Sequence, residues 1–166
     1  MTDTAYLLLG SNMGNKIRLL QEASALIDRL CGKIVRYSSL YESEPWGFAA
    51  EEWFINQVVV ITTFLSPKQL LQTAQGIERT LGRTTVRSAG GAEQYASRPI
   101  DIDILFYNEM VIQTPSLTIP HPLLHERLFT LQPLAEIAAD LPHPVLKKTI
   151  ATLLEECSDT GAVRKL

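Results

Sequence analysis

The chain has 166 residues, of which 46% are hydrophobic and 20% are charged, and its formal net charge at pH 7 is −3. This length and composition suit one globular domain over residues 1–166 and exclude disordered and fibrous classes. The slightly acidic balance produces no global basic field, so neither nucleic acid nor an anionic membrane is expected as the main partner.

Cysteine usage and the first residues indicate the compartment. Cys31 and Cys157 lie far apart and match no metal-binding or redox spacing, which is typical of ordinary thiols in a reducing compartment. The opening sequence MTDTAYLLLG carries an acid and no basic region. No stretch approaches the roughly 20 apolar residues that a membrane span needs. We therefore expect a cytoplasmic protein.

The first half of the chain predicts three strands and one helix. Residues 5–9 form a short apolar run, which predicts a buried strand, and the sequence GSNMGN after it predicts a turn. Asn15 can cap a helix whose apolar positions recur at helical spacing as far as Leu30. Residues 33–43 and 53–65 are rich in β-branched and aromatic residues, which predicts the second and third strands.

The second half adds a helix, a strand and an extension. Residues 66–69 (SPKQ) have the form of a capping box with proline at the first helical position, and the helix ends near Leu81. Residues 83–97 are small, polar and glycine-bearing, which predicts a mobile loop, while 99–107 form the fourth strand and 149–157 a last short helix. The order βαββαβ predicts an α+β ferredoxin-like sandwich, an antiparallel sheet with helices on one face plus a C-terminal helical extension.

Two carboxylates lie one residue apart in the fourth predicted strand. Alternate residues of a strand share a face, so Asp101 and Asp103 point the same way, while Ile102, Ile104 and Phe106 take the face toward the helices. Two like charges this close repel unless a cation lies between them, and Mg²⁺ prefers carboxylate oxygens with substrate phosphates as further ligands. The alternative is a solvent-exposed strand face whose acids keep the sheet soluble.

The stretch from residue 78 to residue 98 holds a local excess of positive charge. Its four arginines face only two acids, and Arg98 lies just before Asp101. Carboxylates that hold a metal ion, with arginines on a neighbouring loop, are the usual parts of a polyphosphate site. This stretch favours the metal-binding interpretation of the aspartates.

Two further motifs have simpler explanations. Residues 10–16 (GSNMGNK) lack the spacing of a phosphate loop. A strand, a glycine turn and a helix N-terminus could still attract an anion, but a tight turn is the simpler interpretation. His121 and His125 stand four residues apart without a third ligand nearby, which disfavours zinc and leaves a phosphate contact or a surface histidine.

Residues 44–57 (EPWGFAAEEWFINQ) combine aromatic side chains with one amide. Trp53 and Phe54 are typical of core or strand positions. A loop that bears Trp46, followed by Asn56 on the next strand, could also build a pocket for a flat ring, in which aromatic faces stack on the ring and the amide reads its polar edge. From this segment alone the core interpretation is the stronger.

Together these segments resemble the 6-hydroxymethyl-7,8-dihydropterin pyrophosphokinase family of folate biosynthesis. The resemblance rests on ASRPIDIDIL, residues 96–105, which fits the family's signature of an arginine followed by D-x-D. It is supported, in the family's order, by the segments LLLGSNMGN, LYESEPWG, FINQVVV, QGIERTLGR and LTIPHPLLHERLF. These segments cover most of residues 5–140.

The resemblance implies a transferase that moves the terminal diphosphate of ATP to the hydroxymethyl group of the dihydropterin and releases AMP. Asp101 and Asp103 would hold two Mg²⁺ ions that bridge the phosphates. Arg83 and Arg98 would be the catalytic arginines of the mobile loop. Only these small molecules are implied as partners, without nucleic acid or membrane, and the chain would act as a monomer.

The resemblance also implies which residues line the two substrate sites. The ATP side would be lined by Gln75, Glu78, Arg87, Tyr95, Ile104, His121 and Arg127. The pterin slot would be formed by Ser43, Pro45, Trp46, Phe54, Asn56 and Phe129. Within this slot, Phe54 and Phe129 would lie on opposite faces of the ring.

Several features depart from the family pattern. Tyr95 stands where some members place tryptophan on the catalytic loop, Gln94 stands where a basic residue is common, and Glu44 replaces an often-seen proline in the pterin loop. The loop also carries extra residues at SAGG, residues 88–91, which affects which arginine corresponds to Arg87. None of these departures removes a metal ligand or the arginine of the signature. They bear on loop closure and affinity more than on the type of reaction.

Two alternatives without catalysis share this topology. An RNA-recognition module is also βαββαβ, but its third strand carries an aromatic pattern that FINQVVVITTF lacks. A catalytically silent nucleotide-binding or regulatory domain would keep the fold alone. The joint presence of Arg98, Asp101, Asp103 and His121 argues against this second alternative.

Overall fold

The computed structural model describes residues 2–45, 52–82 and 99–166. The strands of its main sheet are β1 (Asp3–Ser11), β2 (Lys33–Tyr37), β3 (Tyr41–Ser43), β4 (Phe54–Thr63), β5 (Asp101–Tyr107) and β8 (Val163–Lys165). The helices are α1 (Lys16–Leu30), α2 (Pro67–Thr80), α3 (Leu128–Ala138) and α4 (Ile150–Glu156), with a 3₁₀ turn at Leu124–Glu126. A separate small sheet pairs β6 (Ile112–Gln113) with β7 (Thr118–Ile119).

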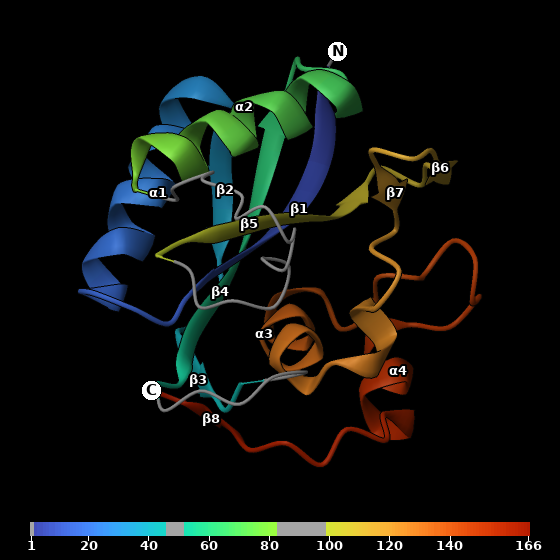
Figure 1. Cartoon of the computed structure of the whole chain (residues 1–166). Helices are drawn as coiled ribbons and strands as arrows, with labels where there is room; N and C mark the ends of the chain where they lie inside the picture. Colours follow the sequence, from blue (N-terminus) through green and yellow to red (C-terminus); the bar gives the residue numbers. More distant parts are fainter. Residues whose placement is uncertain (1, 46–51, 83–98) are drawn as a thin grey trace.

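The main sheet is antiparallel and has the strand order of a ferredoxin-like sandwich. Its path is β5–β1–β4–β3–β8, and β2 also pairs with β4. The four predicted strands therefore lie in the order fourth, first, third, second, as Figure 1 shows. The predicted fold class is confirmed, and β8 from the end of the chain extends the sheet beyond β3.

Helices α1 and α2 cover one face of the sheet. Their buried side chains, such as Ile27 and Leu70, form one hydrophobic cluster with inward residues of β1, β4 and β5. The predicted capping box is present, because Oγ of Ser66 accepts the N–H of Gln69 and the Gln69 side chain accepts the N–H of Ser66. Asn15 caps α1 as predicted. Both helices therefore begin where the local sequence places them.

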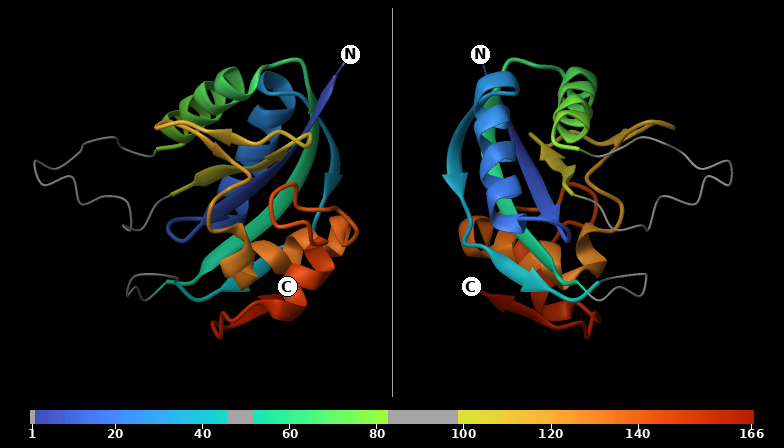
Figure 2. Two further views of the ribbon diagram at one scale, coloured as in Figure 1. Left: turned by 90° about the vertical axis from the view of Figure 1, so that its right-hand side faces the viewer. Right: turned by 60° about the vertical axis from the view of Figure 1, so that its left-hand side comes forward.

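The C-terminal extension covers the opposite face. Residues of α3 and α4 form a second hydrophobic cluster with Leu8, Val58 and Phe106 of the sheet. Figure 2 shows these helices on the side of the sheet away from α1 and α2. The sheet is therefore buried on both faces, which explains why its central strands read as nearly continuous apolar runs.

A β-bulge in β5 changes the face of its last residues. The register with β1 shifts at Leu105, so Ile102 and Ile104 face α1 and α2 as predicted, whereas Phe106 lies in the cluster under α3. The prediction that Phe106 shares the face of the two isoleucines is wrong. One extra residue in a strand reverses the alternation of side chains after it.

Two predicted boundaries also differ from the structure. Gly10 and Ser11 belong to β1, although the sequence predicts a turn there. The second predicted strand is divided into β2 and β3 at Ser38, whose N–H donates to the carbonyl of Val58 and whose Oγ accepts the N–H of Val58. Ser38 thus keeps the chain bonded to β4 where the ladder is interrupted.

Both cysteines are free thiols, and burial raises the pKa of the Cys31 thiol to about 11. A thiol with so high a pKa is inert at neutral pH. Across the described parts of the chain, no helix has both the length and the hydrophobicity to cross a membrane.

Tyr107 joins the end of β5 to two distant segments. Its hydroxyl lies 3.0 Å from Oδ2 of Asp3 and within hydrogen-bond distance of the carbonyl oxygen of Leu65. Burial, together with the nearby Asp3 carboxylate, raises the pKa of Tyr107 to about 12 from its ordinary value of 10.0. The neutral hydroxyl therefore stabilises the folded state below pH 10, and this contribution is lost as the pH rises toward 12.

We expect Tyr107→Phe to lower the free energy of unfolding by about 1–2 kcal/mol at pH 7, because its former partners lose a buried hydrogen bond. Urea denaturation at pH 7 and at pH 11 measures the effect, and the difference from wild type should shrink at the higher pH. Tyr37→Phe is the matched control, since Tyr37 is 52% exposed. Equal denaturation midpoints for wild type and Tyr107→Phe at pH 7 would contradict the prediction.

Candidate functional site

The two aspartates of the D-x-D motif lie on the face of the sheet that α3 covers. Asp101 lies opposite Gly10 of β1, and Gly10 lies opposite Asn56 of β4, so these three residues form one row across the sheet. Asp103 lies opposite Leu8, whose side chain belongs to the cluster under α3. Residues directly opposite each other on neighbouring strands share a face. Both half-buried carboxylates and the Asn56 amide therefore point to the same side.

Gly10 leaves the middle of this row open. A Cβ atom at Gly10 would lie 3.0 Å from Oδ1 of Asn56 and 3.8 Å from Cδ1 of Phe54. The glycine thus keeps space between Asp101 and Asn56. The sequence pattern predicts only a turn at this position, so Gly10 was not among the predicted site residues. The available signal was a glycine at the end of an apolar strand.

Asn56, Ser43 and Phe54 form a connected group at the β4 end of the row. Nδ2 of Asn56 donates to Oγ of Ser43 at 2.7 Å, and both residues are buried. Phe54 is half-buried and lies opposite Ser43 in the β3–β4 ladder. The bond to Ser43 fixes the orientation of the Asn56 amide, with Oδ1 on the side of Gly10.

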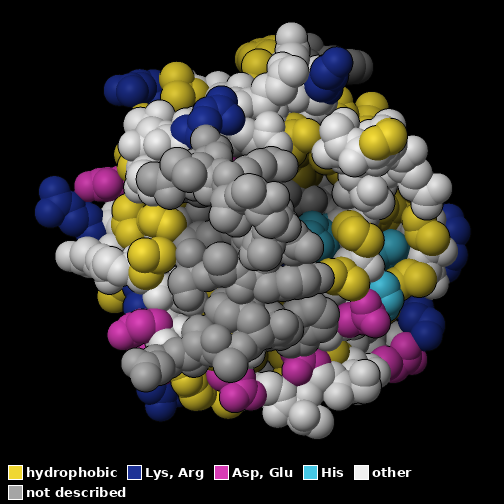
Figure 3. Space-filling model, viewed as in Figure 1, with side chains coloured by type: hydrophobic (Ala, Val, Ile, Leu, Met, Phe, Trp, Pro, Cys, Tyr) yellow, Lys and Arg dark blue, Asp and Glu magenta, His cyan; other side chains and the backbone are white. Residues whose placement is uncertain are grey.

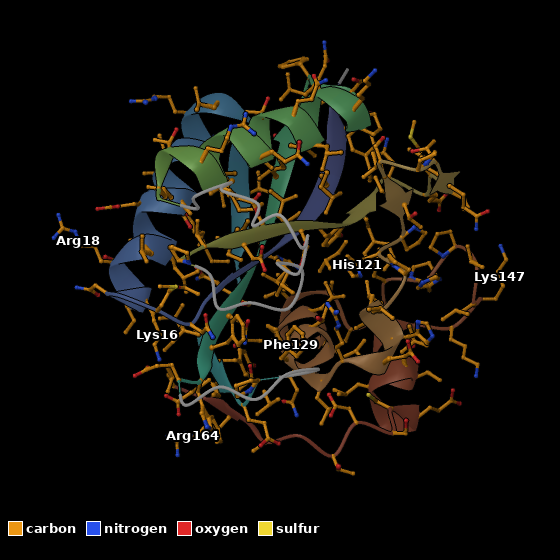
Figure 4. All side chains as sticks on the ribbon, viewed as in Figure 1. Lys16, Arg18, His121, Phe129, Lys147 and Arg164 are labelled. Carbon is orange, nitrogen blue, oxygen red and sulfur yellow. The ribbon has the colours of Figure 1, made fainter. Side chains whose placement is uncertain are left out.

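The start of α3 forms a second wall on this face. Helix α3 packs against β3 and β4, and Phe129 packs against the cluster that contains Leu8 and Val58. The guanidinium of Arg127 lies 5.3 Å from the centroid of the Phe129 ring, a cation–π distance. In Figure 4 the side chains of Phe129 and His121 lie in the middle of the molecule, whereas Arg18 and Lys147 lie at its rim. The structure thus brings residues from three separate segments to one face.

His121 lies on the loop before α3, beside the bulge of β5. The backbone N–H of His121 donates to the carbonyl of Leu105 at 3.1 Å, and the ring atom Nδ1 accepts the backbone N–H of Leu123 at 3.2 Å. Because Nδ1 accepts this bond, the proton of the neutral ring lies on Nε2. Burial first, and then the positive charge of Arg127, lower the pKa of His121 to about 4, while Asp101 acts in the opposite direction. The ring is therefore neutral at pH 7 and offers an N–H donor.

Atoms of the histidine side chains are visible in one region of the molecule. Figure 3 shows them between the β6–β7 hairpin and α4. Within the described ranges, no group of three or more His, Cys, Asp or Glu side chains could hold a metal ion.

Three predicted nucleotide contacts lie on the other side of β5. Ile104 is buried under α1 and α2, and Gln75 is exposed on α2. Glu78 is buried, and its Oε2 accepts the N–H of Ile102 at 2.8 Å, which anchors β5 between the two aspartates. The structure does not bring these three residues onto the face that carries α3. A ligand that contacted both groups would have to pass over β5, which is an edge strand of the sheet.

Several predicted site residues lie outside the described residues, namely Trp46, Arg83, Arg87, Tyr95 and Arg98. Pro45 is half-buried and is the last described residue before residue 46. Its predicted neighbours in the pterin slot, Ser43, Phe54 and Asn56, are all described and lie on the same face as the aspartates.

The residues present fit a hard divalent cation. Asp101 and Asp103 offer carboxylate oxygens on one face, and Gly10 leaves room beside them. Mg²⁺ prefers oxygen ligands and usually keeps waters and substrate phosphates in its coordination shell, so two carboxylates are a suitable protein contribution.

Known proteins resemble the chain over most of its length. The family model described as 7,8-dihydro-6-hydroxymethylpterin-pyrophosphokinase (HPPK) matches residues 6–139. A 2-amino-4-hydroxy-6-hydroxymethyldihydropteridine pyrophosphokinase of Porphyromonas gingivalis is 43% identical over 84% of this chain and 92% of its own length. The Bacillus subtilis protein of the same name is 41% identical over 82% of this chain and 79% of its own length.

Longer proteins also contain a region like this chain. The folic acid synthesis protein fol1 of Pneumocystis carinii is 41% identical over 95% of the chain, which spans only 20% of that protein. A crystal structure of Plasmodium falciparum HPPK-DHPS matches with a TM-score of 0.75 and 21% identity, over 94% of this chain and 44% of that one. At this identity the structural likeness shows the fold alone. The family match over residues 6–139 and the full-length bacterial relatives show that the chain belongs to the 7,8-dihydro-6-hydroxymethylpterin-pyrophosphokinase family.

Proposed function

We propose that the chain transfers the terminal diphosphate of ATP to the hydroxymethyl group of 6-hydroxymethyl-7,8-dihydropterin, giving the pterin diphosphate and AMP in folate biosynthesis. The observation that carries this proposal is the row formed by Asp101, Gly10 and Asn56 on one face of the sheet. Carboxylates for cation-bound phosphates lie at one end, and an amide beside an aromatic ring lies at the other. The ends are two strand spacings apart, roughly 10 Å, which suits two substrates that meet between them.

The β4 end of the row suits a flat heterocycle. The Asn56 amide is fixed by Ser43 and can read the polar edge of a pterin. Phe54 on the sheet and Phe129 on α3 would stack on opposite faces of the ring, and Pro45 and Trp46 would complete the slot. Aromatic faces give such a ring both apolar burial and a preferred geometry.

The Asp101 end suits the phosphates of ATP. Two Mg²⁺ ions held by Asp101 and Asp103 would neutralise charge on the phosphates and at the attacked phosphorus. His121, protonated on Nε2, can donate to a phosphate oxygen, and Arg127 supplies a fixed positive charge. Arg83 and Arg98 would close on the same phosphates.

The reaction needs one bond to form and one to break. The hydroxymethyl oxygen attacks the β-phosphorus and loses its proton, while the bond from that phosphorus to the oxygen bridging it to the α-phosphorus breaks and AMP leaves. Positioning of the two substrates and compensation of phosphate charge supply most of the acceleration. Acid–base groups are therefore a minor requirement.

The remaining expectations concern partners and place of action. We expect the chain to act on these small molecules as a monomer in the cytoplasm, without nucleic acid or membrane as partner. Its net charge of −3 supports the absence of a nucleic-acid role. The family match does not favour a silent nucleotide-binding domain or an RNA-recognition module.

Product analysis tests the proposed reaction directly. Incubation with Mg-ATP and the hydroxymethyl-dihydropterin should yield AMP, and samples that lack either substrate should yield none. Formation of ADP would indicate an ordinary kinase. Absence of any turnover would favour the silent nucleotide-binding domain.

We expect Asp101→Asn and Asp103→Asn each to lower kcat by at least about a hundredfold, because charge stabilisation of several kcal/mol depends on cations held by these carboxylates. Both variants should keep the fold, as circular dichroism can check. Asp140→Asn is the matched control, since Asp140 is exposed on the C-terminal extension. Unaltered turnover in both active-site variants would show that these aspartates do not hold the cations.

We expect His121→Ala to raise the Kd of an ATP analogue about tenfold, because a hydrogen bond to a charged phosphate is lost. The Kd of the pterin should stay within about twofold of the wild-type value. His125→Ala serves as control, because His125 lies on the neighbouring 3₁₀ turn. Equal weakening of nucleotide binding by both variants would remove the specific role of His121.

A further inference from the structure

The C-terminal tail, residues 157–166, returns across the molecule to the predicted pterin slot. Its strand β8 pairs with β3, and Val163 lies opposite Ser43. Figure 1 shows the C-terminus beside β3, and Figure 2 shows the tail running past the start of α3. The family model matches residues 6–139, so the tail lies beyond the matched region.

Glu44 is bonded twice to one residue of the tail. Its N–H donates to the carbonyl of Ala162 at 3.1 Å, and its Oε1 accepts the N–H of Ala162 at 2.7 Å. These two bonds hold the backbone between Ser43 and Pro45. A proline at position 44 would offer neither the N–H nor the carboxylate.

Asp159 bonds the tail to the start of α3. Its Oδ2 accepts the N–H of Leu128 at 3.0 Å, and its Oδ1 accepts the N–H of Gly161 at 2.8 Å. The first N–H groups of a helix have no partner within the helix, and the residue before α3, Arg127, makes no capping bond with its side chain. Asp159 thus supplies a cap that the local sequence lacks, one residue before Phe129.

Gly161 lies between the two carboxylates. A Cβ atom there would lie 3.1 Å from Oδ1 of Asp159 and 3.2 Å from Oε1 of Glu44. The backbone N–H of Gly161 donates to Asp159, and the next N–H, that of Ala162, donates to Glu44. This short stretch of the tail joins one wall of the slot to the other.

We propose that Glu44, Asp159, Gly161 and Ala162 form a C-terminal clamp that positions the two walls of the pterin slot. One wall is the segment 43–45 with the sheet behind it, and the other is the start of α3 with Phe129. The inference rests on the proposed pterin site. A flat ring held between two aromatic side chains depends on the distance between them, so a small displacement of either wall weakens its binding. Glu44 and Asp159 are positioning residues that act through these walls.

Binding measurements on single variants test the clamp. Asp159→Ala and Glu44→Ala should each raise the Kd of the pterin about tenfold, in the presence of a non-hydrolysable ATP analogue, because the slot loses its preformed spacing. The Kd of the ATP analogue should change less than about twofold. Asp159→Asn keeps one of the two acceptor oxygens and should restore only part of the pterin affinity. Glu156→Ala is the control, since it removes only an exposed ion pair with Lys148.

Hydrogen exchange gives a second measurement that does not depend on ligand. The N–H of Leu128 should exchange faster in Asp159→Ala, and the N–H of Ala162 should exchange faster in Glu44→Ala, which removes only an exposed acceptor. If Asp159→Ala fails to fold, Glu44→Ala provides both the exchange and the pterin-binding test.

The outcomes separate the clamp from the proposed reaction. If the wild type is active and Asp159→Ala and Glu44→Ala both keep the wild-type pterin affinity, the clamp is overturned and the reaction stands. Equal weakening of pterin and nucleotide binding would also overturn it, because that result indicates general loss of structure. Wild type that forms no AMP would overturn the proposed reaction. Unaltered exchange at Leu128 in Asp159→Ala would then overturn the clamp independently.

Discussion

The site depends on the register of β1, the strand that pairs with both β4 and β5. Gly10 lies opposite Asn56 on one side and Asp101 on the other. A slip of one residue on either side would turn the amide or the carboxylates toward α1 and α2. Leu9 is buried in the cluster under those helices and Leu8 in the cluster under α3, so a slip would also displace core side chains. Hydrophobic burial on both faces therefore positions the polar site.

The bulge at Leu105 serves both the site and the extension. Before it, β5 directs carboxylates toward α3, and after it Phe106 joins the apolar cluster on that same face. The Phe106 ring packs edge-on against His143, with centroids 5.7 Å apart. The carbonyl of Leu105 accepts the N–H of His121. The bulge thus places Phe106 in the cluster under the C-terminal helices. It also holds His121, which is predicted to contact a phosphate, close to the aspartates.

Local patterns predicted most elements because their causes are local. The capping box at Ser66 and the alternation that places Asp101 and Asp103 on one face each depend on a few neighbouring residues. The face of Phe106 could not be predicted, because a bulge depends on the partner strand. The cap of α3 could not be predicted either, since Asp159 lies 31 residues from Leu128, whose N–H it accepts. Long-range polar contacts leave no periodicity in the sequence.

Glu44 is held by a part of the chain that is distant in sequence. A proline fixes its own backbone φ angle and restrains a loop without any partner. Glutamate has no such restraint, so position 44 needs contacts that limit its backbone. The two bonds to Ala162 provide them, and they connect residues 118 apart in the sequence. Under the proposed clamp, the geometry of the slot would depend on the docking of the C-terminal tail.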